Sequence, residues 1–255
     1  MPLLIIEDVI KEYDGIRALD HVSLKVEKGT IKGLIGPNGA GKTSLFHLIS
    51  CMEKPFSGKI SFKGKDITPL DPHQISALGI GRTFQTVQVW GNMTVVENVM
   101  TGMHLRLKGN ILSSGLWLPW IKKDEEKALE EAKEILAQLD LIGRWRSPVF
   151  QLPLGKQRLL EIGRALAMKP DLILLDEPAS GLTPTEIQHL SERILRFREQ
   201  GMTFLIVEHH MGMVMEIADE VAVLDHGEII VEGPPDLLKN DPRMMNAYLK
   251  KINHA

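Results

Sequence analysis

Residues 36–43, GPNGAGKT, decide the fold of this chain. They match the pattern G-x-x-x-x-G-K-[ST], in which glycines let backbone N–H groups surround phosphate oxygens. The context also fits, because the apolar segment 31–35 precedes the loop and a helical pattern over 41–52 follows it. The loop predicts a nucleotide-binding core in which Lys42 reaches the phosphates and the Thr43 hydroxyl holds Mg²⁺. The candidate nucleotide-binding residues here are Gly36, Pro37, Asn38, Gly39, Ala40, Gly41, Lys42, Thr43 and Ser44.

Size and composition limit the classes of protein to consider. The 255 residues suffice for one large domain or two small ones, and the net charge of −3 argues against broad, charge-driven binding to nucleic acid. A single cysteine excludes an internal disulfide. The sequence has no apolar run near the ~20 residues that cross a bilayer, and its start lacks the features of a secretory signal. We therefore expect a soluble or peripheral protein.

Strand and helix patterns alternate along the chain, which predicts an α/β fold. Segments 171–177, 202–209 and 220–225 are nearly continuous apolar runs, as in buried parallel strands. Two dipeptides, Lys28-Gly29 and Lys63-Gly64, are typical of hairpin turns.

Two helical segments have recognisable ends. Residues 124–143 place apolar residues on one face, and we expect Asp124 to begin this helix and Gly143 to end it. Thr183 and Glu186 are spaced as a capping box at the start of a later helix.

Acidic residues follow a buried strand in DLILLDEP, residues 171–178. Asp176 would bind Mg²⁺ through water, and Glu177 would accept a proton from the attacking water. A strand-ending turn with solvated acids is the alternative. The phosphate loop upstream favours the catalytic interpretation.

A glycine stands at the start of a helix in QLPLGKQR, residues 151–158. Glycine disfavours a helix by roughly 0.5–1 kcal/mol relative to alanine, so Gly155 needs a reason. Free N–H groups and the helix dipole at such an end favour an anion. The segment therefore predicts anion binding at this helix.

The order of these motifs resembles the nucleotide-binding subunit of an ABC transporter. A phosphate loop comes first, a helix opened by L-x-x-G-x-Q follows, and an apolar strand ending Asp-Glu-Pro comes last. The resemblance covers essentially the whole chain and implies an α/β P-loop NTPase (RecA-like) core with an N-terminal antiparallel β subdomain and an inserted α-helical subdomain. It implies one ABC ATPase domain over residues 1–255, with the helical subdomain at about 86–165. In this family each ATP lies between the phosphate loop of one domain and the signature helix of its partner.

The resemblance also assigns roles outside the phosphate loop. Tyr13 falls where an aromatic ring stacks on adenine, although a half-exposed strand tyrosine is the alternative. Gln85, in GRTFQ, corresponds to the glutamine that senses metal and water, and His209 corresponds to the histidine that contacts the γ-phosphate. We expect the neighbouring His210 to be a surface residue. The implied catalytic residues are Glu177, His209 and Gln85, and the implied Mg²⁺ ligands are Thr43, Gln85 and Asp176.

Two departures from the family pattern concern the contact between domains. The usual signature LSGGQ is replaced by LPLGK, so that Pro153 stands for serine and Lys156 for glutamine. Thr183 stands where the loop at residues 179–183 usually has aspartate. These departures predict a second ATPase subunit that is not identical to this one. The implied signature residues are Leu152, Pro153, Leu154, Gly155, Lys156 and Gln157.

Longer strings narrow the branch of the family. The segments GIGRTFQ, MTVVENVM, LEIGRAL, EPASGLTP and NAYLKK resemble the branched-chain amino acid importers. Importers of this branch contain two related ATPases, two integral membrane permease subunits and an extracytoplasmic solute-binding protein, so the resemblance implies these partners. This chain resembles the longer of the two ATPases. The chain would then lie on the cytoplasmic face of the cell (inner) membrane, with ATP and Mg²⁺ as cofactors and no nucleic-acid partner.

Three alternatives remain open from the sequence. Related importers carry urea, short amides or aromatic acids. A soluble ABC protein acting on ribosomes or DNA would usually carry two domains or a long coiled coil, neither of which is found here. A regulator that binds ATP without turnover would fit the altered signature but not the retained Glu177 and His209.

Two further groups of residues have competing interpretations. Trp117 and Trp120 lie on an apolar, proline-broken stretch, and either docking to a membrane subunit or local packing would suit them. Met211, Met213 and Met215 are expected to fill the core rather than to form a partner surface.

Overall fold

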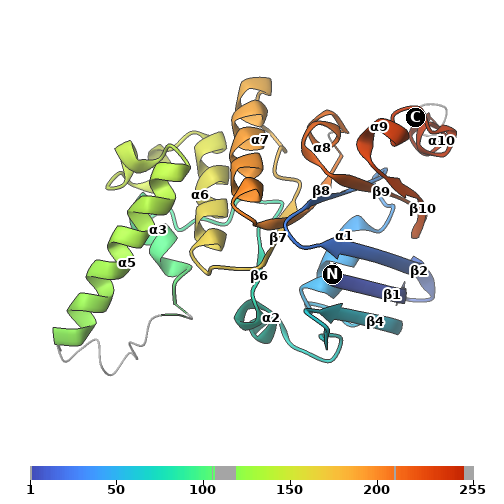
Figure 1. The fold of residues 1–255 in the computed structure, drawn as a ribbon, viewed down its shortest axis with the longest axis horizontal. Helices are drawn as coiled ribbons and strands as arrows, with labels where there is room; N and C mark the ends of the chain where they lie inside the picture. Colours follow the sequence, from blue (N-terminus) through green and yellow to red (C-terminus); the bar gives the residue numbers. More distant parts are fainter. Residues whose placement is uncertain (1, 105, 107–118, 210, 250–255) are drawn as a thin grey trace.

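The computed structural model describes residues 2–104, 106, 119–209 and 211–249, and two β-sheets organise this part of the chain (Figure 1). Trp117 and His210 lie outside these residues. Trp120 lies in helix α5 (Pro119–Gln138), where only the backbone is described. The interpretations of these three residues therefore stay predictions.

The first sheet is antiparallel, with the order β2-β1-β4-β5. Its strands are β1 (Pro2–Tyr13), β2 (Ile16–Glu27), β4 (Ser57–Phe62) and β5 (Lys65–Asp66). Lys63 and Gly64 join β4 to β5, so this predicted hairpin is confirmed.

The hairpin predicted at Lys28-Gly29 is wrong, because these residues cross from the first sheet to the second. Strand β3 (Ile31–Ile35) pairs with parallel strands β8 (Thr203–Glu208) and β9 (Glu220–Asp225), not with β2. All five residues of β3 are buried, which suits the middle of a sheet covered on both faces.

The second sheet has the order β10-β9-β3-β8-β7-β6 among the described strands, and only β10 runs antiparallel to its neighbour. Its remaining strands are β6 (Ile80–Arg82), β7 (Leu172–Asp176) and β10 (Glu228–Gly233). Alternate residues of β7 enter two different cores: Leu172 and Leu174 face one, and Ile173 and Leu175 face the other. The prediction of buried parallel strands is confirmed.

Helix α1 (Lys42–Ile49) packs between the two sheets. Its apolar residues Leu45, Phe46, Leu48 and Ile49 share one core with residues of both sheets. Helix α2 (Pro72–Leu78) then leads into the edge strand β6. The phosphate loop is therefore held between two rigid layers.

A helical region forms the end of the molecule opposite the antiparallel sheet (Figure 1). It contains α3 (Val95–Thr101), α5, the 3₁₀ turns Ile142–Arg144 and Val149–Gln151, and α6 (Leu154–Leu166). Helix α6 also packs against α7 (Pro184–Glu199), which covers the parallel sheet.

The ends predicted for the helix at 124–143 are wrong. Helix α5 begins at Pro119, five residues before Asp124, and ends at Gln138. Asp140 adopts a left-handed conformation with φ of 55°, which terminates the helix before Gly143. The apolar face is nevertheless as expected, since Ala128, Ala132, Leu136 and Leu139 are buried.

Three short helices cover the last strands. They are α8 (Met211–Ile217), α9 (Pro235–Leu238) and α10 (Pro242–Leu249). Met213 is buried in the core shared with α7, and Met211 and Met215 pack against a smaller core formed with β9, so their prediction as core residues is confirmed. Within the described ranges, no helix combines the length and the apolar character needed to span a membrane.

Candidate nucleotide-binding and hydrolysis site

Four adjacent parallel strands bring their carboxyl ends to one edge of the sheet, in the order β3, β8, β7, β6. Gly36 follows β3, His209 follows β8, Asp176 ends β7, and Gln85 comes three residues after β6. Ligands of open α/β sheets bind at this edge. The topology therefore gathers residues that are far apart in the sequence.

The phosphate loop passes so close to other backbone that a side chain on either of two of its glycines would clash. A Cβ on Gly36 would lie 2.1 Å from the carbonyl oxygen of Leu224, and one on Gly41 would lie 2.4 Å from that of Ala18. Gly41 also has a φ of 108° at the start of α1. Gly39 lies in open space, where its amide can approach a ligand.

Lys42 is buried at the start of α1 and points back along the loop. Its Nζ donates to the carbonyl oxygens of Gly36 at 2.7 Å and Pro37 at 3.0 Å. Thr43 is exposed, and Ser44 is half-buried. Asn38 is also exposed, and Ala40 is buried. The loop thus combines a held cation, hydroxyl groups and the positive end of a helix dipole, as an anion site requires.

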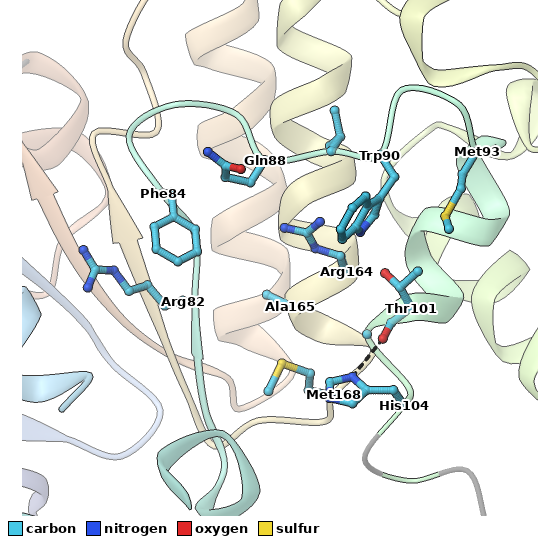
Figure 2. Close-up of a pocket in the computed structure, with 12 residues that line it drawn as sticks. Arg82, Phe84, Gln88, Trp90, Met93, Thr101, His104, Arg164, Ala165 and Met168 are labelled. Carbon is cyan, nitrogen blue, oxygen red and sulfur yellow. Dashed lines mark hydrogen bonds between the residues drawn. The ribbon is translucent and has the colours of Figure 1, made fainter. Parts of the chain in front are cut away.

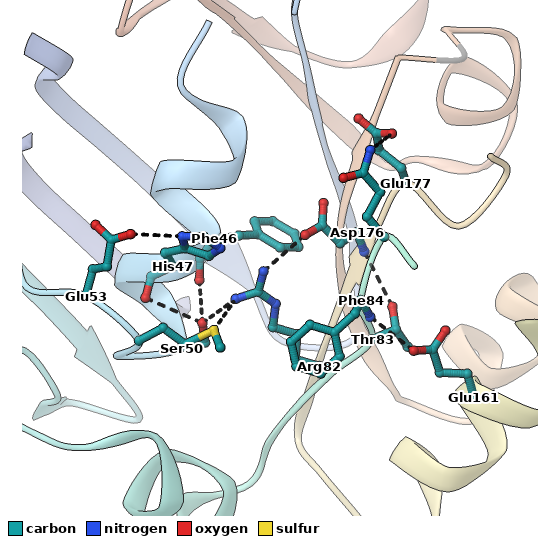
Figure 3. A network of polar contacts seen from close by, with 12 residues as sticks. Phe46, His47, Ser50, Glu53, Arg82, Thr83, Phe84, Glu161, Asp176 and Glu177 are labelled. Atoms are coloured by element: carbon teal, nitrogen blue, oxygen red, sulfur yellow. Dashed lines mark hydrogen bonds and ion pairs between the residues drawn. The ribbon is translucent and has the colours of Figure 1, made fainter. Parts of the chain in front are cut away.

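Asp176 is a buried carboxylate that faces an arginine. Arg82 Nη2 donates to Asp176 Oδ2 at 3.1 Å, while Arg82 Nη1 donates to the Ser50 hydroxyl at 2.7 Å (Figure 3). The guanidinium lies 5.2 Å from the centre of the Phe84 ring. Burial raises the pKa of Asp176, and the neighbouring Arg82 acts in the opposite direction.

Glu177 lies at the meeting point of the other predicted catalytic residues. Gln85 Nε2 donates to Glu177 Oε2 at 2.9 Å, and His209 Nδ1 lies 3.6 Å from the same oxygen. The backbone of Glu177 has a φ of 45°, an uncommon conformation for a side chain of this size. The structure therefore brings Gln85, Glu177 and His209 together from three different strand ends.

Tyr13 lies at the end of β1 with 39% of its surface exposed. Its hydroxyl donates to Glu53 at 2.5 Å, and Lys11 Nζ lies 4.7 Å from the ring centre. Partial burial and Glu53 raise the pKa of Tyr13, and a hydrogen bond with Ser44 acts in the opposite direction. The ring is therefore adjacent to the phosphate loop and partly open to a ligand.

The predicted signature residues form the start of α6, away from the cluster around Glu177. Pro153 occupies the N-cap position, Gly155 is buried, and Lys156 is exposed. Gln157 Nε2 donates to the Leu152 carbonyl oxygen at 2.8 Å. Leu154 is 42% exposed.

A carboxylate already approaches this helix end. A Cβ on Gly155 would lie 2.6 Å from Glu186 Oε1, and the Gly155 amide contributes to a lowered pKa of Glu186, after the larger effect of Thr183. Thr183 and Glu186 form the predicted capping box of α7. Its proximity to α6 was not foreseen, because a capping box is a local pattern and this contact joins two helices.

Four charged residues near the site escaped the sequence analysis: the half-buried Arg82 and the buried Arg158, Glu161 and Glu208. Glu208 accepts hydrogen bonds from the amides of Ala179 at 2.7 Å and His209 at 3.1 Å. A signal was present, because Glu161 interrupts an apolar run and Glu208 ends one. Charges in such positions are seldom buried without partners.

Comparison with known proteins identifies the family. The sequence model described as ABC transporter matches residues 19–180, which include the phosphate loop and the Asp176–Glu177 pair. The chain belongs to the ABC transporter family. The predicted family and the predicted α/β fold are thereby confirmed.

Relatives of this ABC ATPase match over nearly their whole length. The probable branched-chain amino acid transport ATP-binding protein LivG of Archaeoglobus fulgidus is 38% identical over 98% of this chain and 96% of its own. The high-affinity branched-chain amino acid transport ATP-binding protein LivG of Escherichia coli is 35% identical over 97% and 98%, respectively. The crystal structure of the ADP conformation of MJ1267, an ATP-binding cassette of an ABC transporter, has 36% identity and a TM-score of 0.85, covering 98% of this chain and 99% of that one.

The ABC ATPase also has a cavity of about 960 Å³ beside the loop that carries Gln85. Figure 2 shows the loop side chains Gln88 and Trp90, which line this space together with Arg164 near the end of α6 and Met168 just after it. Trp90 is 59% exposed. The cavity is thus an open, largely apolar hollow.

Proposed function

We propose that this chain is the ATP-hydrolysing subunit of an ABC importer for branched-chain amino acids. The observation that carries the proposal is the full-length similarity, at 35–38% identity, to proteins named for branched-chain amino acid transport. We further propose that residues 1–255 act as one ABC ATPase domain, with the helical subdomain at about 86–165.

The adenine and phosphates of ATP would bind along the edge formed by β1 and the phosphate loop. Tyr13 would stack on adenine through the part of its ring left open. Lys42 would exchange its carbonyl partners for phosphate oxygens, and the amides of residues 36–44 would surround the phosphate groups.

Mg²⁺ fits the residues expected to hold it, because Thr43, Gln85 and Asp176 offer a hydroxyl, an amide and a carboxylate oxygen. Such hard oxygen ligands suit this ion. The side-chain nitrogen of Gln85 donates to Glu177, so a cation would bind the side-chain oxygen of Gln85. When bound, the ion would neutralise charge on the β- and γ-phosphates.

Hydrolysis would depend on Glu177 as the base. Its carboxylate would take a proton from the attacking water, with Gln85 and His209 holding that water and the γ-phosphate in line. The hydrogen bond from Gln85 fixes the direction of the carboxylate before substrate arrives, which reduces the reorganisation needed for reaction.

A second ATPase subunit would complete the site, since the signature residues lie apart from this chain's own Glu177. Leu154, next to Gly155, is 42% exposed, and Phe150, in the preceding 3₁₀ turn, is 71% exposed, so both suit burial against a partner. The replacement of LSGGQ by LPLGK favours a non-identical partner whose ATP meets Lys156 instead of a glutamine. Glu186 would have to turn away from Gly155 when that phosphate arrives.

Two integral membrane permease subunits would dock this chain on the cytoplasmic face of the cell membrane. The cavity beside Trp90 and Met93 has the size and apolar lining to take a short permease helix. An extracytoplasmic binding protein would deliver the solute to the permeases.

Purification of the tagged chain from its native membrane tests the assembly. We expect a second ABC ATPase and two permeases to co-purify, and we expect the complex in liposomes to couple ATP hydrolysis to leucine uptake. Uptake of urea, an amide or an aromatic acid instead of leucine would reassign the solute. A chain found only in the cytosol without a permease would overturn the transport proposal.

A further inference from the structure

Arg158, in the signature helix α6, forms hydrogen bonds with the loop that carries Gln85. Its guanidinium is buried, and it donates to the backbone carbonyl oxygens of Phe84 at 2.9 Å and Gln85 at 2.5 Å. The two bonds leave from two different nitrogens, so the planar group fixes both position and direction of this backbone.

Glu161, one turn further along α6, holds the same loop by its amides. Glu161 Oε1 accepts from the Phe84 amide at 3.2 Å (Figure 3). The same oxygen accepts from the Gln88 amide at 3.4 Å, and Glu161 Oε2 lies 3.6 Å from Arg158 Nη1. Its side chain is 2% exposed. Burial raises the pKa of Glu161, while the two amides and Arg158 act to lower it.

Packing alone does not require this arrangement. A buried ion pair adds little net stability compared with well-packed apolar side chains, whereas it does fix one geometry. Here the pair lies between one rigid helix and one loop. It binds two carbonyl oxygens and two amides between Phe84 and Gln88, so the loop cannot slide along α6 without breaking several charge-assisted hydrogen bonds.

Helix α6 connects the predicted signature residues to the loop that carries Gln85. Its first turn carries Gly155, and three residues later Arg158 holds the backbone of Gln85. Gln85 in turn donates to Glu177. A continuous set of contacts therefore runs from the tip of α6 to the predicted base of this chain.

We propose that Arg158 and Glu161 are positioning residues that attach the Gln85 loop to the signature helix. Because of them, movement of α6 moves Gln85 relative to Glu177. This inference rests on the proposed function, in which the tip of α6 contacts ATP bound to the partner ATPase. Occupancy of the partner's site would then control how Gln85 is placed in this chain's own site.

The test compares Arg158→Lys with a matched control in the purified transporter. Lysine keeps the charge but cannot donate from a planar fork to both carbonyl oxygens. Arg106→Lys is the control, since Arg106 forms a forked pair with Glu131 and donates to the Ala167 carbonyl oxygen without touching residues 84–88. Each variant is examined for melting temperature, ATP affinity, kcat, KM and the Hill coefficient for ATP.

We expect Arg158→Lys to bind ATP within about twofold of the unchanged protein while kcat falls about tenfold, the change expected for loss of one charged hydrogen bond in the reacting state. The Hill coefficient should fall toward one, because the two sites no longer communicate. Arg106→Lys should change the melting temperature but neither kcat nor the Hill coefficient. Glu161→Gln, which retains shape, carries the same test should Arg158→Lys not fold.

Hydrogen exchange gives a readout that does not depend on turnover. In a Glu177→Gln background, added Mg–ATP should change the exchange of the amides of residues 84–88, and Arg158→Lys should remove that change. If Arg158→Lys and Glu161→Gln both match Arg106→Lys in kcat, Hill coefficient and exchange, the pair of Arg158 and Glu161 is merely structural and the inference is overturned. Absence of ATP hydrolysis in the unchanged transporter would instead contradict the proposed function, while the exchange response would still test the attachment.

Discussion

Gln85 and His209 both approach the same oxygen of Glu177, one by a hydrogen bond of 2.9 Å and the other at 3.6 Å. The three residues come from the ends of β6, β8 and β7, and the sheet order places these ends side by side. A carboxylate with two polar neighbours on one oxygen keeps the other oxygen for a further ligand. This arrangement suits a base that must face one water molecule.

Replacement of Glu177 by glutamine should stop turnover and spare binding. The amide cannot accept the proton of water at neutral pH, so we expect kcat to fall by about 10²–10⁴. Nucleotide affinity should remain, because the phosphate loop is untouched. Phosphate release and calorimetric titration with ATP measure the two effects. Glu192→Gln, on the exposed face of α7, is the control, and unchanged turnover in Glu177→Gln would remove Glu177 from its assigned role.

Replacement of Tyr13 separates stacking from hydrogen bonding. Tyr13→Phe keeps the ring and loses only the hydrogen bonds of the hydroxyl, to Glu53 and Ser44, so ATP affinity should change little. Tyr13→Ala removes the ring, and the loss of stacking on adenine should weaken binding by about 1–3 kcal/mol. Titration of both variants with ATP and with inorganic triphosphate distinguishes adenine contact from disturbance of the loop. Equal affinities for Tyr13→Ala and Tyr13→Phe would show that the tyrosine is an ordinary strand residue.

The motifs that could be predicted are those whose residues are contiguous. The glycines of GPNGAGKT lie close together in one short loop, so the sequence alone reveals the motif. The strand before Asp176 is apolar over its whole length, so it can also be predicted from the sequence. The contact between Arg82 and Asp176 joins residues 94 apart, and only the pairing of β6 with β7 creates it. No local pattern contains that information.

The errors in the fold have the same origin. Lys28-Gly29 has the propensity of a hairpin turn, but propensity does not decide which sheet the next strand joins. Strand β3 is buried on both faces, and only the middle of the parallel sheet provides two covered faces. Asp124 similarly has the character of a cap, yet the helix extends upstream to Pro119.

Alanine at Gly41 should destabilise the protein and impair nucleotide binding together. A Cβ there would meet the Ala18 carbonyl oxygen at 2.4 Å, and the φ of 108° strains any residue with a side chain. Overpacking of this kind lowers the free energy of unfolding by about 1–3 kcal/mol. Urea unfolding and ATP titration measure the effects. Gly91→Ala, where no atom lies within 4 Å of the new Cβ, should change neither, and a Gly41→Ala protein of full stability and affinity would contradict the description of the loop.

The pair formed by Arg106 and Glu131 should make stability depend on pH in the acid range. Hydrogen bonds from Arg106, and to a smaller extent from Lys169, lower the pKa of Glu131 from 4.5 to about 2, despite partial burial. Because the folded-state pKa is depressed, this stabilisation is present above about pH 4.5 and is lost as pH falls toward 2. Arg106→Gln should therefore lose about 1 kcal/mol of unfolding free energy at pH 7 and less at pH 3. Urea unfolding at both pH values measures this, with Lys239→Gln, which pairs with the exposed Asp236 three residues away, as the control. An equal loss at pH 7 and pH 3 would mean that the arginine acts through packing rather than through its charge.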